Sequence, residues 1–183
     1  GRWAEAQGHN RLFGHVRGAR IAKNVIEGCA SRGIKYLTLF AFSTENWLRP
    51  SAEVSLLMRL LFLRLNRERA NLIRNNIKFR CIGNLDRLPS EVRNTVLKTV
   101  RDTDHCTGMT LTFALSYGGR QEITSAAQDI ARLVKAGRLN PDEITTEMVA
   151  GHMESAFLPD PDLIIRTSGE SRLSNFFLWS AAY

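Results

Sequence analysis

Short apolar runs alternate with segments of helical periodicity along this chain, and this alternation is the strongest constraint on its fold. The predicted strands are Lys35–Phe42, Ile77–Gly83, Met109–Ser116 and Asp162–Thr167. The predicted helices are His15–Ser31, Ala52 to about Asn75, Pro89 to about Thr103, Gln121–Ala136 and Thr145–Ser155. Strands that alternate with helices form βαβ units. We therefore predict an α/β fold with a mostly parallel central sheet flanked by helices.

The length and composition of the chain predict a single globular domain over residues 1–183. Hydrophobic residues make up 44% and charged residues 23% of the 183 residues, and no repeat, linker or low-complexity segment interrupts them. Apolar runs such as Leu60–Leu63 are too short to span a bilayer. The three cysteines (Cys29, Cys81 and Cys106) show no metal-binding spacing. This pattern favours a reduced, cytoplasmic protein without a zinc site.

Arginines follow the ends of the predicted strands in a chain whose net charge is +7. The carboxyl ends of parallel strands are where such folds bind ligands. The residues concerned are Arg49, Arg120, Arg166 and Arg172, with Arg87 as a weaker instance. The planar guanidinium group suits phosphate oxygens, and neighbouring glycine or serine residues let the backbone approach them. We predict a phosphorylated small ligand; incidental surface arginines are the competing interpretation.

The segment from Ala52 to Asn75 is apolar around most of its circumference. Ser51 is expected to cap this helix, and only a face with Ser55, Arg59 and Asn66 is expected to be exposed. One interpretation is a helix packed between the sheet and another element. The other is an apolar wall that lines a cavity for a greasy substrate or pairs with a second subunit. Arginines at one end of an apolar tunnel, between sheet and helices, would fit a lipid diphosphate.

Five motifs carry a resemblance to a known family. They are "GRWA" with "RLFGH", "LTLFAFSTENWLRP" followed by "EV", "YGGR", and "DLIIRTSGESRLSNFFLW". In order and spacing the chain resembles the cis-prenyltransferases, or (Z)-isoprenyl diphosphate synthases, and most closely the bacterial undecaprenyl diphosphate synthases. The resemblance implies condensation of isopentenyl diphosphate with an allylic diphosphate, farnesyl diphosphate. The implied product is a long-chain cis-polyprenyl diphosphate such as undecaprenyl diphosphate, the lipid carrier precursor for cell-wall synthesis.

The resemblance also implies roles for individual residues. The allylic diphosphate is held by Gly1, Arg2, Arg11, His15 and Arg49, and isopentenyl diphosphate by Arg166, Arg172 and Ser174. A mobile loop beside the reacting carbons contains Ser43, Asn46 and Trp47, and Trp3, Thr44, Glu45 and Leu173 complete the substrate-binding set. Asn46 is assigned to proton removal. Because a carboxamide is a poor base, we expect Asn46 to orient substrate and pass a proton to departing diphosphate. Trp47 is expected to cover the allylic cation with its π face.

The resemblance implies that the intact enzyme depends on Mg²⁺. The expected ligands are an Asp upstream of Gly1 and a Glu beyond Tyr183, so no metal ligand is expected within these residues. We therefore expect the chain to be a single domain truncated at both ends. The resemblance further implies a cytoplasmic homodimer that delivers its product to the membrane, with peripheral membrane association left open. Its partners are then farnesyl diphosphate and isopentenyl diphosphate, and no nucleic acid.

Two other functions remain open at this point. Some members of such families keep the fold without the chemistry, and the chain could be a non-catalytic partner subunit. The high pI of about 9.8 alone would also fit a nucleic-acid-binding domain. Such domains interleave aromatic and basic residues on one surface, a pattern that this sequence lacks. The sequence does not determine product length; Met109 and the apolar helix are expected to contribute to the tunnel.

Overall fold

The structure, a computed structural model, describes residues 2–9, 11–167 and 169–182. Two compact units make up the chain, Gly1–Ser116 and Tyr117–Tyr183. The first unit contains α1 (Arg2–Ala6), α2 (Arg11–Ser31), β1 (Tyr36–Ser43), η1 (Thr44–Leu48), α3 (Ser51–Arg74), β2 (Lys78–Ile82), η2 (Leu85–Arg87), α4 (Ser90–Asp102) and β3 (Thr110–Tyr117), which ends at the boundary. The second contains α5 (Gly119–Lys135), η3 (Pro141–Glu143) and α6 (Thr146–Gly151).

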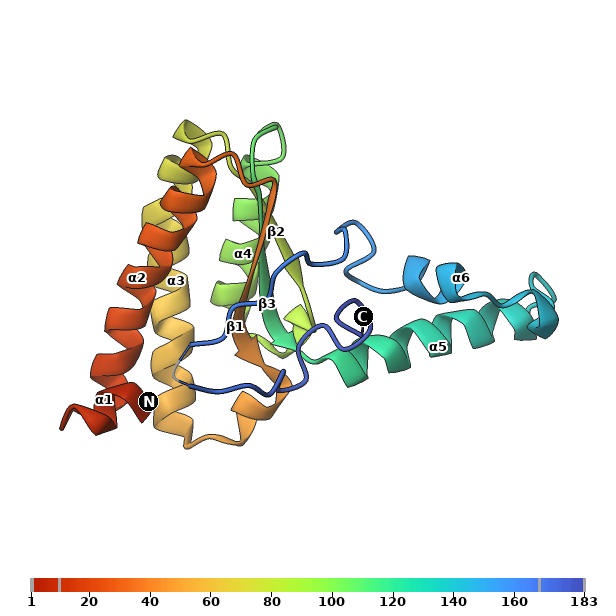
Figure 1. Ribbon diagram of the computed structural model, residues 1–183, viewed down its shortest axis with the longest axis horizontal. Helices are drawn as coiled ribbons and strands as arrows, with labels where there is room; N and C mark the ends of the chain where they lie inside the picture. The colour runs from red at the N-terminus through yellow and green to blue at the C-terminus, as the bar shows by residue number, and fades with distance from the viewer. Residues whose placement is uncertain (1, 10, 168, 183) are drawn as a thin grey trace. The chain divides into compact units, whose positions relative to one another are not determined.

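The three strands form one open sheet in the order β1-β3-β2. Strands β2 and β3 run parallel, with Lys78 opposite Thr110 and Ile82 opposite Ala114. On the other side of β3, the Thr110 N–H donates to the carbonyl of Lys35, just before β1. Helices α3 and α4 pack against each other and against β2 (Figure 1). The predicted fold class, a parallel sheet flanked by helices, is confirmed, whereas the apolar tunnel stays a prediction.

The core of the first unit lies between the sheet and its helices. It contains Phe42 of β1, Val96 of α4 and Leu111 of β3, each at most 2% exposed. Helix α3 contributes a buried stripe at seven-residue spacing, Met58, Leu65 and Leu72. Its other apolar residues are only partly buried, and Leu63 is 50% exposed. Val54, Leu57, Leu61 and Phe62 also pack against this core. Ser55, Arg59 and Asn66 are exposed as expected, but the exposure of Leu63 shows that α3 buries less of its surface than predicted.

Strand β2 lies at one edge of the described sheet, and α4 covers part of that edge. In a parallel strand, alternate N–H groups point to opposite neighbours. The Lys78 N–H donates to Met109 beside β3, whereas the Phe79 N–H donates to the Thr103 hydroxyl at 3.0 Å. The Thr103 hydroxyl in turn donates to the Thr99 carbonyl. A buried threonine at the end of α4 thus satisfies an edge donor that would otherwise lack a partner.

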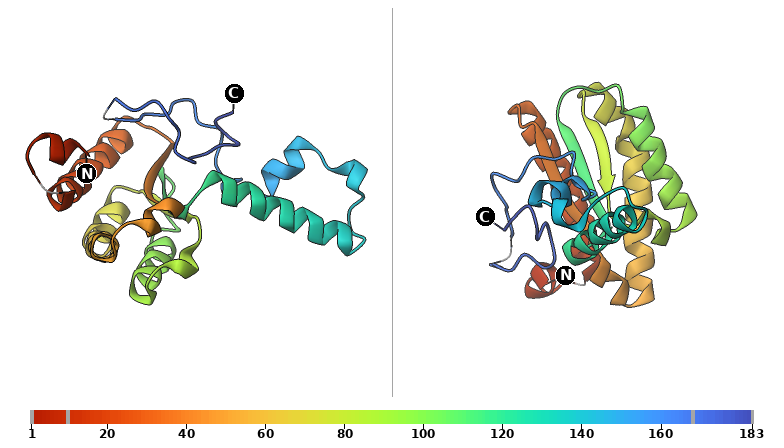
Figure 2. Two further views of the ribbon diagram at one scale, coloured as in Figure 1. Left: turned by 90° about the horizontal axis from the view of Figure 1, so that it is seen from below. Right: turned by 90° about the vertical axis from the view of Figure 1, so that its right-hand side faces the viewer.

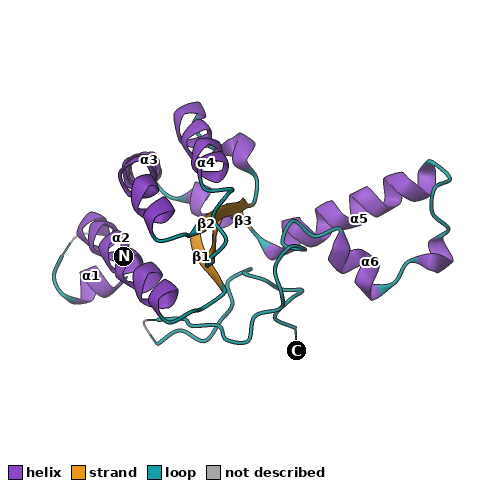
Figure 3. Cartoon of the chain, turned by 90° about the horizontal axis from the view of Figure 1, so that it is seen from above, coloured by secondary structure: helices purple, strands orange, loops and turns teal. Residues whose placement is uncertain are grey.

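In the second unit, α5 and α6 contact each other, and the left view of Figure 2 shows α6 running back alongside α5. Tyr117, Ala126, Ile130 and Phe177 are buried here. Thr145 caps α6 by accepting the Met148 N–H, and the helix ends at Gly151 rather than at the predicted Ser155. After α6 the described chain has turns and loops only (Figure 3).

The predicted fourth strand, Asp162–Thr167, is not a strand. Leu163 and Ile165 are 74% and 78% exposed, and the described residues of this segment pair with no strand of the sheet. An apolar run becomes a strand only where a neighbour accepts its backbone hydrogen bonds. The predicted cap is also wrong, because α3 begins at Ser51 itself. The N-cap position is taken by Pro50, without a side-chain hydrogen bond.

Candidate functional site

A short 3₁₀ turn, η1, carries the segment Ser43–Trp47 away from the carboxyl end of β1. The Oδ1 atom of Asn46 accepts the backbone N–H of Ser43 at 3.2 Å and closes this turn. The Oγ1 atom of Thr44 is buried and has no hydrogen-bond partner among the described residues, while Glu45 is exposed. A buried polar atom without a partner is costly and indicates a place for a ligand or water. Asn46 therefore has a structural role as a cap, beside the role in proton transfer that stays a prediction.

Trp47 is held on three sides. Its indole Nε1 donates to the Ser116 hydroxyl at 2.9 Å, and its ring meets Phe42 edge-on with centroids 4.9 Å apart. The Arg87 guanidinium lies 5.1 Å from its ring centroid, a cation–π contact. In this conformation Trp47 can cover an allylic cation only with the face opposite Arg87.

Ser116 is a residue that sequence reasoning missed. It is 2% exposed and has φ of 50°, in the left-handed region that is uncommon for residues other than glycine. Its hydroxyl accepts from Trp47, and its carbonyl accepts the Asn84 N–H. The sequence offers no signal for this role, because Ser116 reads as the last residue of a strand.

Glu53 is a second missed residue, and it joins two that were predicted. The same oxygen, Oε1, lies 3.0 Å from His15 Nε2 and 2.7 Å from Arg49 Nη1. Burial raises the pKa of the Glu53 carboxyl, but the hydrogen bonds from His15 and then Arg49 outweigh it and lower the pKa below its ordinary value. A charged carboxylate thus brings together two groups predicted to hold the allylic diphosphate. The available signal was the i, i+4 spacing of Arg49 and Glu53.

The remaining predicted residues of the N-terminal segment have little described structure. Gly1 lies outside the described residues, as do the side chains of Arg2 and Arg11. Trp3 is 43% exposed on α1, with the Arg17 guanidinium 4.8 Å from its ring centroid. No described contact joins Trp3 to His15 or Arg49.

In the second unit, one loop gathers the residues predicted to hold isopentenyl diphosphate. Arg166 Nη1 donates to the Ser174 hydroxyl at 2.8 Å and to the backbone carbonyl of Arg172. Arg172 pairs with Glu170 at 2.7 Å, and both arginines are exposed. Leu173, 37% exposed, lies between Arg172 and Ser174 along the loop. The Arg172 side chain is 61% exposed and the Glu170 side chain 18%, so the guanidinium group of Arg172 is accessible on its outer side.

Gly119 of "YGGR" has a packing role, whereas the approach of phosphate to these glycines stays a prediction. A Cβ on Gly119 would lie 2.9 Å from the Leu178 side chain, so only glycine fits. The Gly119 N–H donates to the carbonyl of Asn175, and the Arg120 N–H donates to the Asn175 Oδ1. The first two amides of α5 therefore already have acceptors within the protein.

A buried pair braces the same unit. The Tyr117 hydroxyl donates to the Glu122 carboxylate, whose other oxygen accepts the Ser155 N–H at 2.9 Å. Burial, and then the hydrogen bond to Glu122, raise the pKa of Tyr117 far above its ordinary value. Tyr117 therefore stays a neutral donor, and it also meets Phe176 and Phe177 edge-on.

The described residues show neither a metal-binding cluster nor a membrane-spanning helix. No three of their His, Cys, Asp and Glu side chains form a group that could hold a metal ion. The Glu53 carboxylate beside the predicted site is already engaged by His15 and Arg49. Among the described helices, none is both long and apolar enough to cross a membrane.

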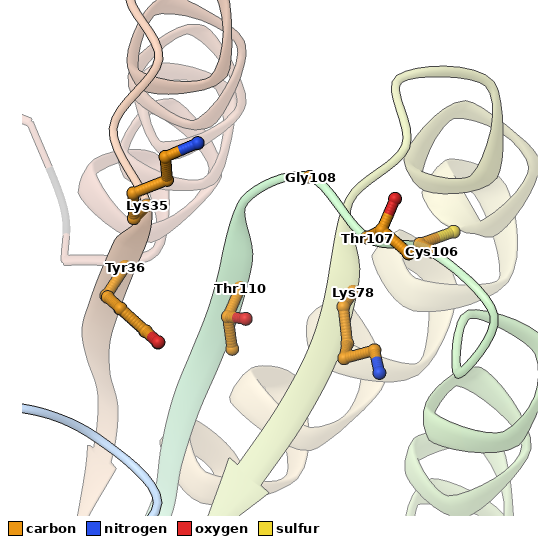
Figure 4. Close-up of a pocket in the computed structure, with 7 residues that line it drawn as sticks. All are labelled: Lys35, Tyr36, Lys78, Cys106, Thr107, Gly108 and Thr110. Atoms are coloured by element: carbon orange, nitrogen blue, oxygen red, sulfur yellow. The ribbon is translucent and has the colours of Figure 1, made fainter.

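A pocket of about 290 Å³ lies at the other end of the strands. Figure 4 shows its lining at the amino ends of β1, β2 and β3: Lys35, Tyr36, Lys78, Cys106, Thr107, Gly108 and Thr110. Ligands of parallel sheets bind at the carboxyl ends. Lys78 is moreover paired with Asp104 at 3.5 Å. The pocket is therefore separate from the candidate site.

Comparison with known proteins gives matches along the whole chain. The family model described as "Putative undecaprenyl diphosphate synthase" matches residues 1–183. An isoprenyl transferase of Chlorobaculum tepidum is 46% identical over 100% of this chain and 69% of its own length. Two solved structures are also similar. Lavandulyl diphosphate synthase from Lavandula x intermedia, in complex with dimethylallyl diphosphate, has a TM-score of 0.94 and 36% identity, covering 98% of this chain and 78% of that one. A probable undecaprenyl diphosphate synthase from Campylobacter jejuni has a TM-score of 0.79 and 34% identity, covering 92% and 76%.

Proposed function

This chain belongs to the undecaprenyl diphosphate synthase family of prenyltransferases, which are transferase enzymes, and from this premise we propose that it elongates farnesyl diphosphate with isopentenyl diphosphate. Each cycle forms one carbon–carbon bond and a new cis double bond, and releases diphosphate and a proton. The product is a long-chain cis-polyprenyl diphosphate such as undecaprenyl diphosphate. The observation that carries the proposal is the loop that joins Arg166, Arg172 and Ser174 by hydrogen bonds.

The diphosphate of isopentenyl diphosphate binds to that loop. Two guanidinium groups and a hydroxyl offer charged and neutral donors to phosphate oxygens, the chemistry that arginine suits better than lysine. Because Arg166 is held by both Ser174 and the Arg172 carbonyl, little side-chain freedom is lost when the substrate binds.

The allylic diphosphate binds to His15 and Arg49, together with Arg2 and Arg11. Glu53 holds His15 and Arg49 on one carboxylate oxygen and so sets their spacing before substrate arrives. Arg49 has five N–H donors in all, and one of them suffices for the bond to Glu53. The remaining donors of the guanidinium group can then face phosphate oxygens.

The segment from Ser43 to Trp47 lies beside the reacting carbons. The Asn46 carbonyl oxygen accepts the Ser43 N–H with one lone pair, and its second lone pair can take the proton that leaves the substrate. An N–H of the same amide then donates a proton to the departing diphosphate, and the other N–H orients substrate. Trp47, fixed by Ser116, presents one ring face to the developing allylic cation. The buried Thr44 hydroxyl supplies a further group to a bound substrate.

Magnesium dependence stays a prediction. The described residues do not fit a magnesium site by themselves, since no three carboxylate, imidazole or thiol groups converge. No step above therefore uses a metal ion. Its test is removal of Mg²⁺ by a chelator and its restoration in the assay of the full-length protein.

We propose a long-chain product because the chain is more similar in sequence to isoprenyl transferases than to lavandulyl diphosphate synthase. The isoprenyl transferases of Chlorobaculum tepidum and Geobacter sulfurreducens are 46% and 48% identical to this chain, and lavandulyl diphosphate synthase is 36% identical. A homodimer, delivery of product to a membrane and a role in cell-wall synthesis belong to the same proposal.

One assay tests the proposed function. The full-length protein is incubated with farnesyl diphosphate, radiolabelled isopentenyl diphosphate and Mg²⁺, and the products are sized. A ladder that ends at long polyprenyl diphosphates is expected. No incorporation of label by a folded protein would overturn the proposal and favour a non-catalytic partner subunit. A single condensation would instead indicate a short-chain enzyme.

A further inference from the structure

Asn175 joins the loop that contains Arg166 and Arg172 to the N-terminus of α5. Its carbonyl accepts the Gly119 N–H at 2.7 Å, and its Oδ1 accepts the Arg120 N–H at 2.8 Å. Its Nδ2 donates to the Gln121 Oε1 at 3.1 Å. The first N–H groups of a helix have no acceptor within the helix, and Gly118 at the N-cap offers no side chain. Asn175 therefore caps α5 from a distant part of the chain.

The backbone at this point is strained, and the cap holds it. Ser174 and Asn175 both have positive φ, 53° and 63°. Asparagine adopts this conformation more easily than most residues, whereas for serine it is energetically unfavourable. Such strain persists only where the neighbouring contacts determine the conformation. Here those contacts include the hydrogen bonds of Asn175 to Gly119, Arg120 and Gln121, with Phe177 also at positive φ two residues later.

The loop joined by Asn175 is the proposed diphosphate site. Ser174, the residue before Asn175, accepts from Arg166, which also bonds the carbonyl of Arg172. We propose that Asn175 is a positioning residue for isopentenyl diphosphate, an inference that rests on the proposed function. By fixing the Ser174 backbone, it sets the spacing of the Ser174 hydroxyl and the two guanidinium groups. A change at Asn175 therefore acts on affinity for isopentenyl diphosphate without loss of any group that touches it.

The N-terminus of α5 does not take that role itself. A helix N-terminus preceded by glycines is a common anion site. In this chain, however, the amides of Gly119 and Arg120 are already bonded to Asn175, and Gly119 packs closely on Leu178. Helix α5 thus contributes to the proposed diphosphate site by holding Asn175 and, with it, the loop that contains Arg166, Arg172 and Ser174.

The test compares two substrates in the full-length protein. Asn175→Gly keeps the positive φ and removes only the side-chain bonds to Arg120 and Gln121. It is expected to raise the KM and Kd for isopentenyl diphosphate about tenfold, the equivalent of one ordinary hydrogen bond. The KM for farnesyl diphosphate and kcat are expected to stay within about twofold of wild type. Binding of isopentenyl diphosphate is measured by calorimetry without allylic substrate.

Three variants serve as references. Arg172→Ala removes a proposed diphosphate contact and should give the same substrate pattern, with a larger effect. Asn140→Ala removes a comparable cap, the bond from the Asp142 N–H at η3, and should leave both KM values unchanged. Gln121→Ala removes only the partner of Asn175 Nδ2, and a smaller rise in the same KM is expected. If Asn175→Gly fails to fold, Gln121→Ala provides the test of the positioning role in its place.

The outcomes separate the two proposals. If wild-type protein neither binds nor consumes isopentenyl diphosphate, the proposed function fails and the role of Asn175 fails with it. If wild type binds it and both Asn175→Gly and Gln121→Ala bind it equally well, the positioning role alone is overturned. Equal losses for both substrates, matched by Asn140→Ala, would indicate a general loss of stability and would also overturn that role.

Discussion

The indole Nε1 of Trp47 lies 2.9 Å from the hydroxyl oxygen of Ser116. This hydrogen bond joins the turn after β1 to the last residues of β3, at the carboxyl edge of the sheet. Ser116 makes this contact from a left-handed backbone conformation, with φ of 50°. A ring predicted to face the reacting carbons is therefore fixed by a neighbouring strand and not by its own loop.

Substitution of Ser116 should separate the hydrogen bond from the backbone strain. Ser116→Ala is expected to lose about 1–2 kcal/mol of unfolding free energy, because the Trp47 N–H loses a buried acceptor. Ser116→Gly loses the same bond but relieves the left-handed backbone, so its loss should be smaller. Urea denaturation of both variants gives the comparison. An alanine variant as stable as wild type would contradict the importance of this bond.

Asn46 offers a pair of substitutions that distinguishes capping from catalysis. Asn46→Asp keeps an oxygen for the Ser43 N–H and removes the amide donor, so a near-normal melting temperature is expected. Its kcat should fall roughly 10²–10³-fold, the scale of losing a positioned proton-transfer or electrostatic group. Asn46→Ala should lose both properties. Steady-state kinetics and thermal denaturation of one preparation distinguish capping from catalysis. A normal kcat for Asn46→Asp would contradict the catalytic role.

Glu53 should stabilise the first unit through its charge. Glu53→Gln keeps the shape but weakens the contacts to His15 and Arg49. A loss of about 1–2 kcal/mol is expected, because hydrogen bonds to charged groups exceed neutral ones and Arg49 is partly exposed. Glu68→Gln, which alters a more exposed pair with Lys23, is the matched control and should cost less. Equal losses for the two variants would count against a special role for Glu53.

The same carboxylate predicts a pH dependence. The pKa of Glu53 is lower in the folded protein than its ordinary value of 4.5. The contribution of the Glu53 carboxylate to the free energy of unfolding is therefore complete above about pH 4.5. This contribution is lost as the pH falls through the lowered pKa. The unfolding free energy of wild type should fall more steeply below pH 4.5 than that of Glu53→Gln. Parallel curves would contradict the assignment.

Met109 tests the predicted tunnel. It is 4% exposed and belongs to the core that contains Phe42 and Met58. Met109→Ala should cost about 2–5 kcal/mol by leaving a cavity. If that cavity extends a tunnel, the full-length enzyme should also make longer products. Ala41→Leu, the opposite change, should shorten them. An unchanged product ladder from both folded variants would make Met109 an ordinary core residue.

Local patterns predicted β1, β2 and β3 because each is an apolar run with a neighbour to pair with. Asp162–Thr167 has the same composition but lacks such a neighbour among the described residues, and composition alone does not supply one. The candidate site divides in the same way. Arg166, Arg172 and Ser174 were predictable because they lie close in sequence and their loop brings them together. Glu53 and Ser116 were missed because their partners His15 and Trp47 come from distant segments.

The bond between the Phe79 N–H and the Thr103 hydroxyl also has a consequence between molecules. An outward-pointing donor on an edge strand is a template on which a second chain can add a strand. By occupying that donor, the last turn of α4 removes one of the hydrogen bonds that such an addition needs. The buried Thr103 thus leaves this edge with one donor fewer for the backbone of a second molecule.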